Sequence, residues 1–426
     1  MTEPRMGVSA VLRATPTPVR YLLAGMLINQ LGAFVQTFLI LYLTFQGTPV
    51  SVAGICLAAY SVGSIFGGML GGELTHRFGA RLTIVTAMSL SAPLVALIPL
   101  VSGPRIPWAL FVVVGLAGLA TQAYRPAAAV LVGDLMPEHL KVMGFSMMRI
   151  ALNIGAAVAP ALAALLILVD WNLLFWLDAA TAGLWALLAF VLLPRHTATD
   201  DHREEKPDKP VQVLTAREVY ARMVRDSRFL CYLIASASGM LVYASSVAVL
   251  PLNIVADGYP TGLYSAVLMI SSIVVITCEL KVTTYIIRIP KRFAGFSGNV
   301  VSGVGYVLYG LMAGGGAFVV IGALLVVAGV MVHGPSTASH AATFPAELRS
   351  RYLGIRETMA GIGSATGPLV GLAIFTSFGG PVFWGFCAAM SLLAGSLHLY
   401  GLKPAPVEPE PERVITLEPE VVGEKS

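Results

Sequence analysis

Twelve apolar stretches, each about long enough to cross a bilayer as a helix, follow one another along the chain with short polar breaks between nearly all of them. An α-helix needs roughly 20 predominantly apolar residues to cross a hydrocarbon core of ~30 Å. The pattern therefore predicts an all-α membrane protein with twelve transmembrane helices. The expected spans are Tyr21–Phe45, Val52–Glu73, Leu82–Val101, Trp108–Gly133, Phe145–Val169, Leu173–Leu193, Phe229–Asn253, Leu263–Thr284, Phe293–Ala313, Phe318–Ser339, Tyr352–Ser377 and Val382–Leu402.

The composition agrees with this pattern. Hydrophobic residues make up 56% of the chain and charged residues 12%, against about 25% charged residues in an ordinary soluble domain. The net charge is +4, but the basic residues are spread over alternate breaks and form no single patch, so we expect no nucleic-acid partner. Residues 1–20 lack the compact apolar core of a signal peptide, and we expect the first span itself to direct insertion into the bilayer.

The positions of Lys and Arg indicate the orientation, because these residues accumulate on the cytoplasmic side of short loops. Every second break carries Lys or Arg, whereas the breaks on the other side carry only Arg105. Both termini are therefore expected in the cytoplasm.

The longest polar break, Pro194 to Arg228, divides the chain into two sets of six helices. The expected organisation is a cytoplasmic N-terminus (1–20), a six-helix bundle (21–194), a cytoplasmic linker (195–228), a second six-helix bundle (229–402) and a disordered cytoplasmic tail (403–426). Within the linker, Thr215-Ala-Arg-Glu218 has the form of a capping box and is followed by apolar residues at helical spacing. This pattern predicts a short helix on the inner membrane surface.

The two halves are related by an internal repeat. A shift of 208 positions places Pro137-x-x-Leu140-Lys141 on Pro345-x-x-Leu348-Arg349, and Ile154-Gly155-x-x-x-Ala159-Pro160 on Ile362-Gly363-x-x-x-Gly367-Pro368. Such duplication implies a pseudo-twofold axis along the membrane normal and a central cavity between halves that rock to face either side. Small residues permit close helix approach and proline bends a helix. The candidates for helix packing or gating are Gly155, Pro160, Gly363, Gly367 and Pro368.

The break after the second span reads Gly72-Glu-Leu-Thr-His76-Arg77-Phe-Gly79-Ala-Arg81. It resembles the G-x-L-a-D-R-x-G-R-R/K signature between helices 2 and 3 of the major facilitator superfamily. Tyr124-Arg125-Pro126-Ala, Gly133-Asp134-Leu-x-Pro137 and Arg149-x-x-x-Asn153-x-Gly155 are similar to the drug-efflux branch of that family, notably multidrug-resistance proteins of bacterial inner membranes. The resemblance covers Tyr21 to Leu402 and implies a major facilitator fold with drug:proton antiport.

The resemblance also implies a cytoplasmic gate at this loop. Its candidate residues are Gly72, His76, Arg77, Gly79 and Arg81. His76 stands where the family has an acid that takes part in a charge network latching the cytoplasmic side. The histidine is therefore expected to weaken the latch or to make it depend on pH, since histidine titrates near neutrality.

Ionisable side chains inside a span cost several kcal/mol and mark functional candidates. Burial disfavours the charged form of a carboxylate, so such a group binds and releases a proton in the physiological range, as proton coupling requires. The candidates for proton coupling are Glu279, Glu357 and Asp178. Each also fits a structural role: Glu279 near Lys281 and Glu357 beside Arg356 as ion pairs, and Asp178, for which this role is favoured, as a hydrogen-bonding group.

The resemblance further implies which helices line the central cavity. The candidate substrate-cavity residues are Asn29, Gln36, Gln122, Tyr124, Arg125, Asn153, Tyr243, Asn253 and His333. Asn29 and Gln36 are seven residues apart and so lie on one helical face. A lone histidine such as His333 is more often a hydrogen-bonded core residue than a ligand. A mostly apolar cavity with scattered hydrogen-bonding groups suits amphipathic organic molecules better than sugars or phosphates.

The sequence thus predicts a monomeric secondary transporter of the inner membrane that exports drugs or other amphipathic small molecules in exchange for protons. There is no G-x-x-x-x-G-K-S/T sequence, so ATP does not drive it directly, and we expect no cofactor. The spans show neither a metal-ligand cluster nor a paired nucleophile and base, so we expect no metal site, no catalytic residue and no enzyme. The alternatives are a dedicated exporter or importer of one metabolite or lipid and, from another class and less favoured, a membrane-embedded enzyme or a non-transporting sensor.

Overall fold

The computed structural model of the chain describes residues 8–102, 107–195, 216–260, 262–341, 343–344 and 346–403. Every regular element in these ranges is helical. The first part of the expected linker, Thr215 of its capping box and the expected tail after 403 lie outside the described residues.

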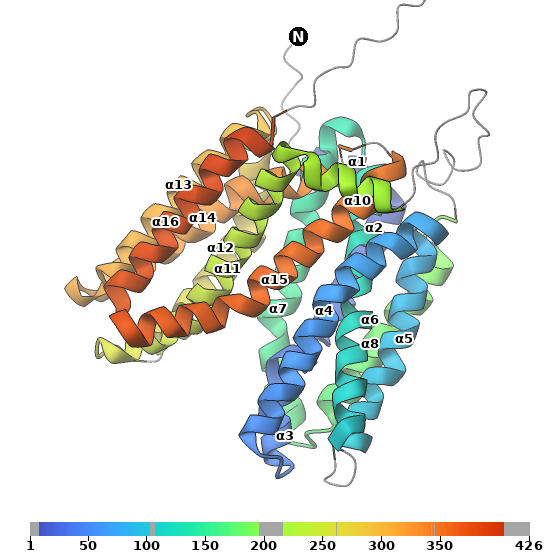
Figure 1. The fold of residues 1–426 in the computed structure, drawn as a ribbon, viewed down its shortest axis with the longest axis horizontal. Helices are drawn as coiled ribbons and strands as arrows, with labels where there is room; N and C mark the ends of the chain where they lie inside the picture. The colour runs from blue at the N-terminus through green and yellow to red at the C-terminus, as the bar shows by residue number, and fades with distance from the viewer. Residues whose placement is uncertain are drawn as a thin grey trace, which may run out of the picture.

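The helices form two bundles, which confirms the predicted fold class (Figure 1). The N-terminal bundle holds α2 (Thr17–Leu31), α3 (Val35–Phe45), α4 (Val50–Phe78), α5 (Ala80–Val101), α6 (Pro107–Leu135), α7 (Lys141–Ile167) and α8 (Leu173–Leu192). The C-terminal bundle holds α11 (Ser227–Ala256), α12 (Gly262–Ile286), α13 (Lys291–Gly310), α14 (Gly316–Ala341), α15 (Ala346–Phe378) and α16 (Gly380–Gly401). Two short 3₁₀ turns, Glu138–Leu140 and Met312–Gly314, connect helices within the bundles.

Eleven segments of the described chain are long and apolar enough to cross a membrane, with α2 and α3 together counting as one. The remaining long helix, α13, begins with Lys291 and Arg292 and carries a buried Asn299. The Asn299 amide donates a hydrogen bond of 2.7 Å to the Gly295 carbonyl, and α13 packs between α14 and α16. Burial against neighbouring helices therefore accommodates the least hydrophobic span.

Glycines allow the closest helix contacts inside the bundles. A Cβ atom added to Gly363 would lie 2.3 Å from the Ala237 carbonyl oxygen, and one on Gly367 would lie 2.6 Å from that of Leu241. Gly155, the repeat equivalent of Gly363, faces the Gln30 side chain in the same way, at 2.6 Å. These glycines lie where α15 packs on α11 and α7 packs on α2, so the geometry gives each of them a packing role.

The first expected span is two helices rather than one. The chain leaves the helical path after Leu31 and resumes it at Val35, and a Cβ on Gly32 would lie 2.1 Å from the Thr181 hydroxyl of α8. The buried Asp178 carboxylate of α8 accepts hydrogen bonds from the backbone N–H groups of Phe34 (3.1 Å) and Val35 (3.4 Å). Asp178 thus caps the N-terminus of α3 and satisfies donors that have no partner within the helix.

Removing this cap is expected to destabilise the fold. The Asp178→Ala variant leaves two buried N–H groups without an acceptor and should lower the free energy of unfolding by about 2 kcal/mol or more, seen as a lower midpoint of thermal unfolding in detergent. Asp178→Asn keeps one acceptor oxygen and should retain most of the stability. An Asp178→Asn protein that folds normally but loses pH-driven transport would instead place Asp178 in proton coupling.

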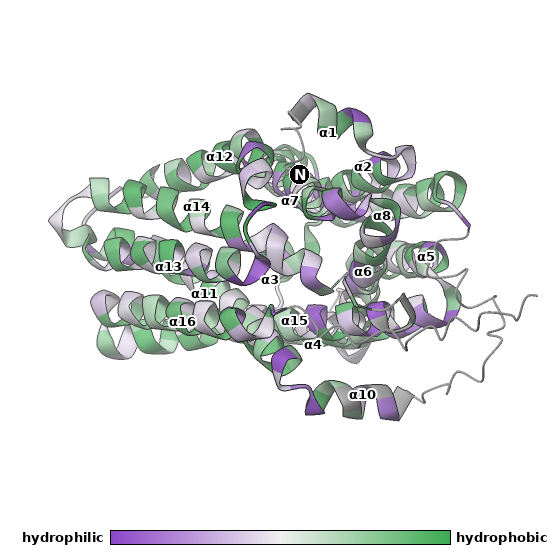
Figure 2. Cartoon of the chain, turned by 90° about the horizontal axis from the view of Figure 1, so that it is seen from above, coloured by the Kyte–Doolittle hydropathy of each residue, from purple (hydrophilic) through white to green (hydrophobic). Residues whose placement is uncertain are grey.

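One end of the molecule carries most of the described basic side chains and is called the basic end here. It is formed by α1 (Val8–Ala14), α10 (Ala216–Arg225), the turns at Gly79, Pro137 and Pro290, and the beginning of α15. The opposite end is formed by the turns at Gly47, Gly258, Gly315 and Gly379, all with positive φ. The helix expected in the linker is present as α10, whereas α1 has no counterpart among the elements expected from the sequence. Figure 2 shows α1 and α10 on opposite flanks of the bundles.

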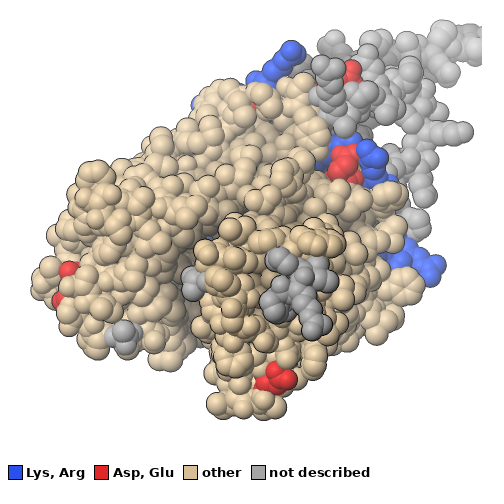
Figure 3. Space-filling model, turned by 60° about the horizontal axis from the view of Figure 1, so that its bottom comes forward, with Lys and Arg blue, Asp and Glu red and all other residues tan. Residues whose placement is uncertain are grey.

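The two bundles meet at the basic end and diverge toward the opposite end (Figure 1). Figure 3 shows them from the diverging side as two lobes with few charged side chains on their surfaces. This shape leaves the contacts at the basic end as the main connection between the halves.

Candidate functional site

Two glycines allow the bundles to touch at the basic end. A Cβ on Gly72 of α4 would lie 2.8 Å from the Cα atom of Gly354 on α15, and one on Gly354 would lie 2.9 Å from the Cα atom of Gly72. Each position leaves no room for a side chain. The α4–α15 contact is thus a backbone-to-backbone approach, as between packed transmembrane helices with small residues at the interface.

An ion pair lies directly beside this contact. Glu73 accepts two hydrogen bonds from the Arg351 guanidinium across the bundle interface, at 2.8 and 3.1 Å, and a third from Arg77 one turn further along α4, at 2.8 Å. The bidentate geometry orients the pair as well as attracting its partners. We call Glu73–Arg351 the outer pair, because it lies near the basic end.

Glu73 was not among the expected gate residues, because the acidic position of the family signature corresponds to His76 in this chain. The two residues are one helical turn apart, so an acid at Glu73 shares a helix face with His76. The signal was present in the Gly72-Glu-Leu sequence itself. Gly79 ends α4 with a φ of +84°, and Arg81 donates to the Phe190 carbonyl of α8 within the N-terminal bundle. Of the expected gate residues, Gly72 therefore makes the direct contact between the bundles, and Arg77 donates a hydrogen bond to Glu73.

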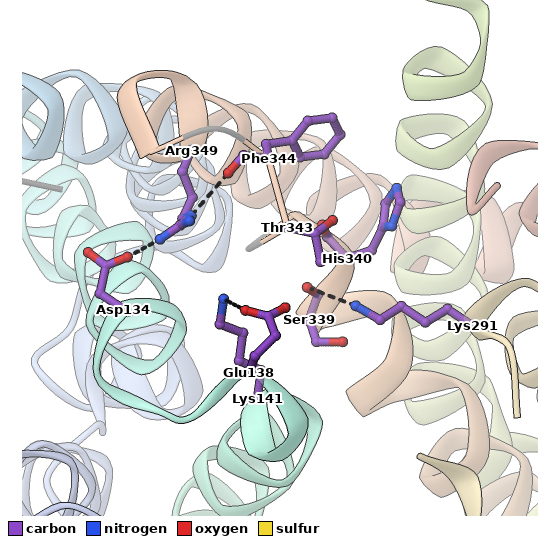
Figure 4. A network of polar contacts seen from close by, with 9 residues as sticks. All are labelled: Asp134, Glu138, Lys141, Lys291, Ser339, His340, Thr343, Phe344 and Arg349. Atoms are coloured by element: carbon purple, nitrogen blue, oxygen red, sulfur yellow. Dashed lines mark hydrogen bonds and ion pairs between the residues drawn. The ribbon is translucent and has the colours of Figure 1, made fainter. Parts of the chain in front are cut away.

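A second cross-bundle contact lies at the same end. Asp134, at the end of α6, pairs with Arg349 of α15, whose Nε also donates to the Phe344 carbonyl at 3.3 Å (Figure 4). The Asp134 side chain is fully buried. Lys141 instead pairs with Glu138 within its own bundle. The Asp134–Arg349 contact adds a second charged connection between the halves.

A further ion pair joins α7 to α12, deeper in the interface. The Nε atom of Arg149 lies 3.0 Å from Oε1 of Glu279, and the same guanidinium donates to the Val330 carbonyl at 2.8 Å. Glu279 is fully buried, and Arg149 is the cationic partner of its carboxylate. We call Arg149–Glu279 the inner pair. The hydroxyls of Ser146 and Thr283 meet at 2.7 Å on the same two helices.

The outer and inner pairs join helices that the internal repeat makes equivalent, although the paired residues themselves are not at equivalent positions. A shift of 208 positions superposes α4 on α12 and α7 on α15, so each pair joins an acid on the second span of one half to an arginine on the fifth span of the other. Arg149 is equivalent to Glu357, six positions beyond Arg351, which corresponds to roughly 9 Å along a helix. The bundles are thus held by two similar contacts at different depths.

A cavity of about 210 Å³ lies between the bundles on the other side of the Gly72 contact. Its polar lining includes Gln36, Ser61, Ser64, Gln122 and Arg125 from the N-terminal bundle and Glu357 and Ser364 from the C-terminal bundle. Met240 is its largest apolar side chain. The lining is therefore more polar than the mostly apolar cavity expected from the sequence, because the helices contribute small and polar residues at their closest approach.

The structure places the other expected cavity residues elsewhere. Tyr124 is buried in the core of the N-terminal bundle, and Asn253 accepts a hydrogen bond of 2.7 Å from the Trp384 indole. Asn153 donates to the Arg149 carbonyl at 2.8 Å. Asn29, Tyr243 and His333 also lie outside the lining of this cavity.

The expected charge partners also differ. Glu279 was expected beside Lys281 of its own helix and pairs instead with Arg149 of α7. Glu357 pairs with Arg356, its neighbour in sequence, as expected for a structural pair. Within the described ranges, no group of three or more His, Cys, Asp or Glu side chains is arranged to hold a metal ion.

The family model of the Major Facilitator Superfamily matches residues 22–339 and 287–421. The chain belongs to the Major Facilitator Superfamily. It is 25% identical over 393 residues to the uncharacterized MFS-type transporter YhjO of Bacillus subtilis, covering 90% of this chain and 92% of that protein. It is 28% identical over 250 residues to the multidrug resistance protein MdtH of Edwardsiella ictaluri, covering 58% of each.

Solved structures show the same fold. The fucose:proton symporter FucP of E. coli superposes with a TM-score of 0.75 at 15% identity, covering 92% of this chain and 100% of that one. This major facilitator protein is therefore a multi-pass membrane transporter whose two bundles are closed at the basic end and apart at the other.

Proposed function

We propose that this transporter exports small organic molecules in exchange for protons by alternating access. The observation that carries the proposal is the inner pair, Arg149–Glu279, a charged contact between the two bundles whose acid is fully buried. A conformational change that opens the basic end must separate α7 from α12 and so break this pair. The similarity to the multidrug resistance protein MdtH supports export.

The chemistry of the inner pair links the proton to this motion. While Glu279 is charged, its attraction to Arg149 holds α7 against α12 and keeps the basic end closed. Protonation of this buried carboxylate removes the cost of burying its charge, together with its attraction to Arg149. Protonation therefore weakens the contact and favours opening at the basic end, where the acid meets water and releases its proton.

Transport in inverted membrane vesicles tests the function. Inverted vesicles present the cytoplasmic face outward, so an exporter should take up fluorescent dyes or candidate antibiotics when the lumen is made acidic. Collapse of the pH gradient with an ionophore should release the accumulated compound. Accumulation that is unaffected by the ionophore would contradict proton coupling.

The orientation is a separate prediction. We expect the basic end to face the cytoplasm, because the loops there carry the Lys and Arg residues. Single cysteines at Val169, which is exposed at the opposite end, and at Thr199, in a background without the native cysteines, should differ in intact cells: a membrane-impermeant maleimide should label the Val169 site only. Labelling of the Thr199 site and not of the Val169 site would reverse the topology.

The alternative function is a dedicated exporter or importer of a single metabolite. The small polar cavity favours this alternative over the export of drugs, because sites for drug-sized ligands are typically larger and more apolar. A screen in which only one compound is accumulated among many dyes and antibiotics would support it.

A further inference from the structure

Arg125 is the feature of the cavity that the proposed function leaves unused. It lies in the middle of α6 and lines the cavity together with Gln36 and Gln122. No described carboxylate lies within 4.0 Å of its guanidinium, and its buried Nε atom has no hydrogen-bond acceptor among the described residues. A guanidinium at this depth in a membrane protein is costly unless it is paired.

Two other charged side chains near the bundle interface, Arg149 and Glu357, each form an ion pair within the protein. Arg149 is paired with Glu279, and Glu357, the acid that lines the cavity, is paired with Arg356. The Glu357 charge is therefore balanced on its own helix. Among the described residues that line the cavity, Arg125 carries the charge that has no protein partner.

The guanidinium of Arg125 favours an anionic ligand. A guanidinium presents a planar fork of N–H donors that matches the two oxygens of a carboxylate, and it remains charged under all physiological conditions. A cationic amine in the same cavity would be repelled by it. The two glutamine amides add neutral donors and acceptors near Arg125, which suit the remaining polar groups of a small solute.

We propose that the transported molecule is a small organic carboxylate and that Arg125 binds its acid group. The inference deepens the proposed function and rests on it, since it takes the cavity to be the transport site. A volume of about 210 Å³ lies below the ~300–1,000 Å³ of drug-sized ligand sites, so the substrate is small. The ligand neutralises Arg125 and thereby removes the cost of its unpaired charge.

Matched probes test the choice of charge. Benzoate, benzamide and benzylamine share one ring and differ in an anionic, a neutral and a cationic group. Phenylacetate and salicylate, with their amides and amines, extend the comparison. We expect only the acids to raise the thermal unfolding temperature of the purified wild-type protein at pH 7.5. Equal stabilisation by the amides or amines, or none by any acid, would overturn the proposal.

Variants at the site test the residue. Arg125→Gln removes the charge and should weaken acid binding at least about tenfold, whereas Arg125→Lys keeps the charge and should retain part of the affinity. Arg292→Gln, at the start of α13 outside the cavity, is the matched control and should bind the acids like the wild type. Acid binding that survives in Arg125→Gln would exclude Arg125. The wild-type comparison decides the ligand class even where a variant fails to fold.

Different results would contradict proton-coupled export and the binding of a carboxylate by Arg125. Wild-type protein that binds the acids, in vesicles that show no pH-driven uptake of them, would leave the binding of the acid group by Arg125 standing and overturn their proton-coupled transport. Uptake of benzamide driven by a pH gradient, without uptake of benzoate, would support proton coupling and overturn the role of Arg125.

Discussion

The Glu279→Gln variant should lose pH-driven accumulation of substrate. Glutamine has the shape of the acid but binds no proton. The contact between α7 and α12 therefore no longer depends on the pH on either side of the membrane. With one proton exchanged for each substrate, a gradient of one pH unit sustains at most about a tenfold concentration ratio. In vesicles or proteoliposomes the variant should reach a ratio of about one, while exchange of labelled for unlabelled substrate continues.

Another glutamate provides the comparison for this result. Glu138 forms a local pair with Lys141 at the surface, with 78% of its side chain exposed, and Glu138→Gln should accumulate substrate like the wild type. A well-folded Glu279→Gln protein that still concentrates substrate with unchanged pH dependence would exclude Glu279 as the coupling group.

A single methyl group at Gly72 should open the basic end. The added Cβ of Gly72→Ala would overlap Gly354 and the Ser350 carbonyl oxygen, each at 2.8 Å. Overpacking of this kind costs about 1–3 kcal/mol, which shifts the closed-to-open equilibrium about 5- to 150-fold toward opening. Spin labels at the exposed Phe78 and Ile289, one on each bundle, should report a longer distance by double electron–electron resonance.

The same helix offers a control for this substitution. A Cβ at Gly54 of α4 has no neighbour within 4 Å, so Gly54→Ala should leave the label distances unchanged. Gly354→Ala, from the other side of the contact, should reproduce the effect of Gly72→Ala. Unaltered distances in both contact variants would show that the α4–α15 approach does not limit opening.

The helical architecture could be predicted because it depends on local composition. A run of apolar residues must form a helix in a bilayer, whatever it packs against. The break between α2 and α3 could not be predicted in this way. It contains no proline, and its cap, Asp178, lies more than 140 residues away in sequence.

The charge partners show the same limit. The cost of burying Glu279 could be predicted from the sequence, because it depends on the residue type alone. The expected partner, Lys281, was wrong. The structure supplies Arg149 from the other half of the chain. Arg125 was a candidate for the substrate cavity and lines the cavity between the bundles. Whether it has a partner depends on the placement of every surrounding acid and could be read only from the folded chain.

The reciprocity of the outer and inner pairs bears on how such a chain could arise. In an assembly of two identical units around a twofold axis, a contact from residue i to residue j is always accompanied by one from j to i. A six-helix unit with an acid on its second helix and an arginine on its fifth would therefore join to a copy of itself through two equivalent ion pairs. In this chain the shift of 208 positions places Lys281 at the position of Glu73 and Glu357 at that of Arg149, so the two contacts join equivalent helices through residues that are not equivalent. The two contacts are therefore dissimilar, where those of a symmetric dimer would be identical.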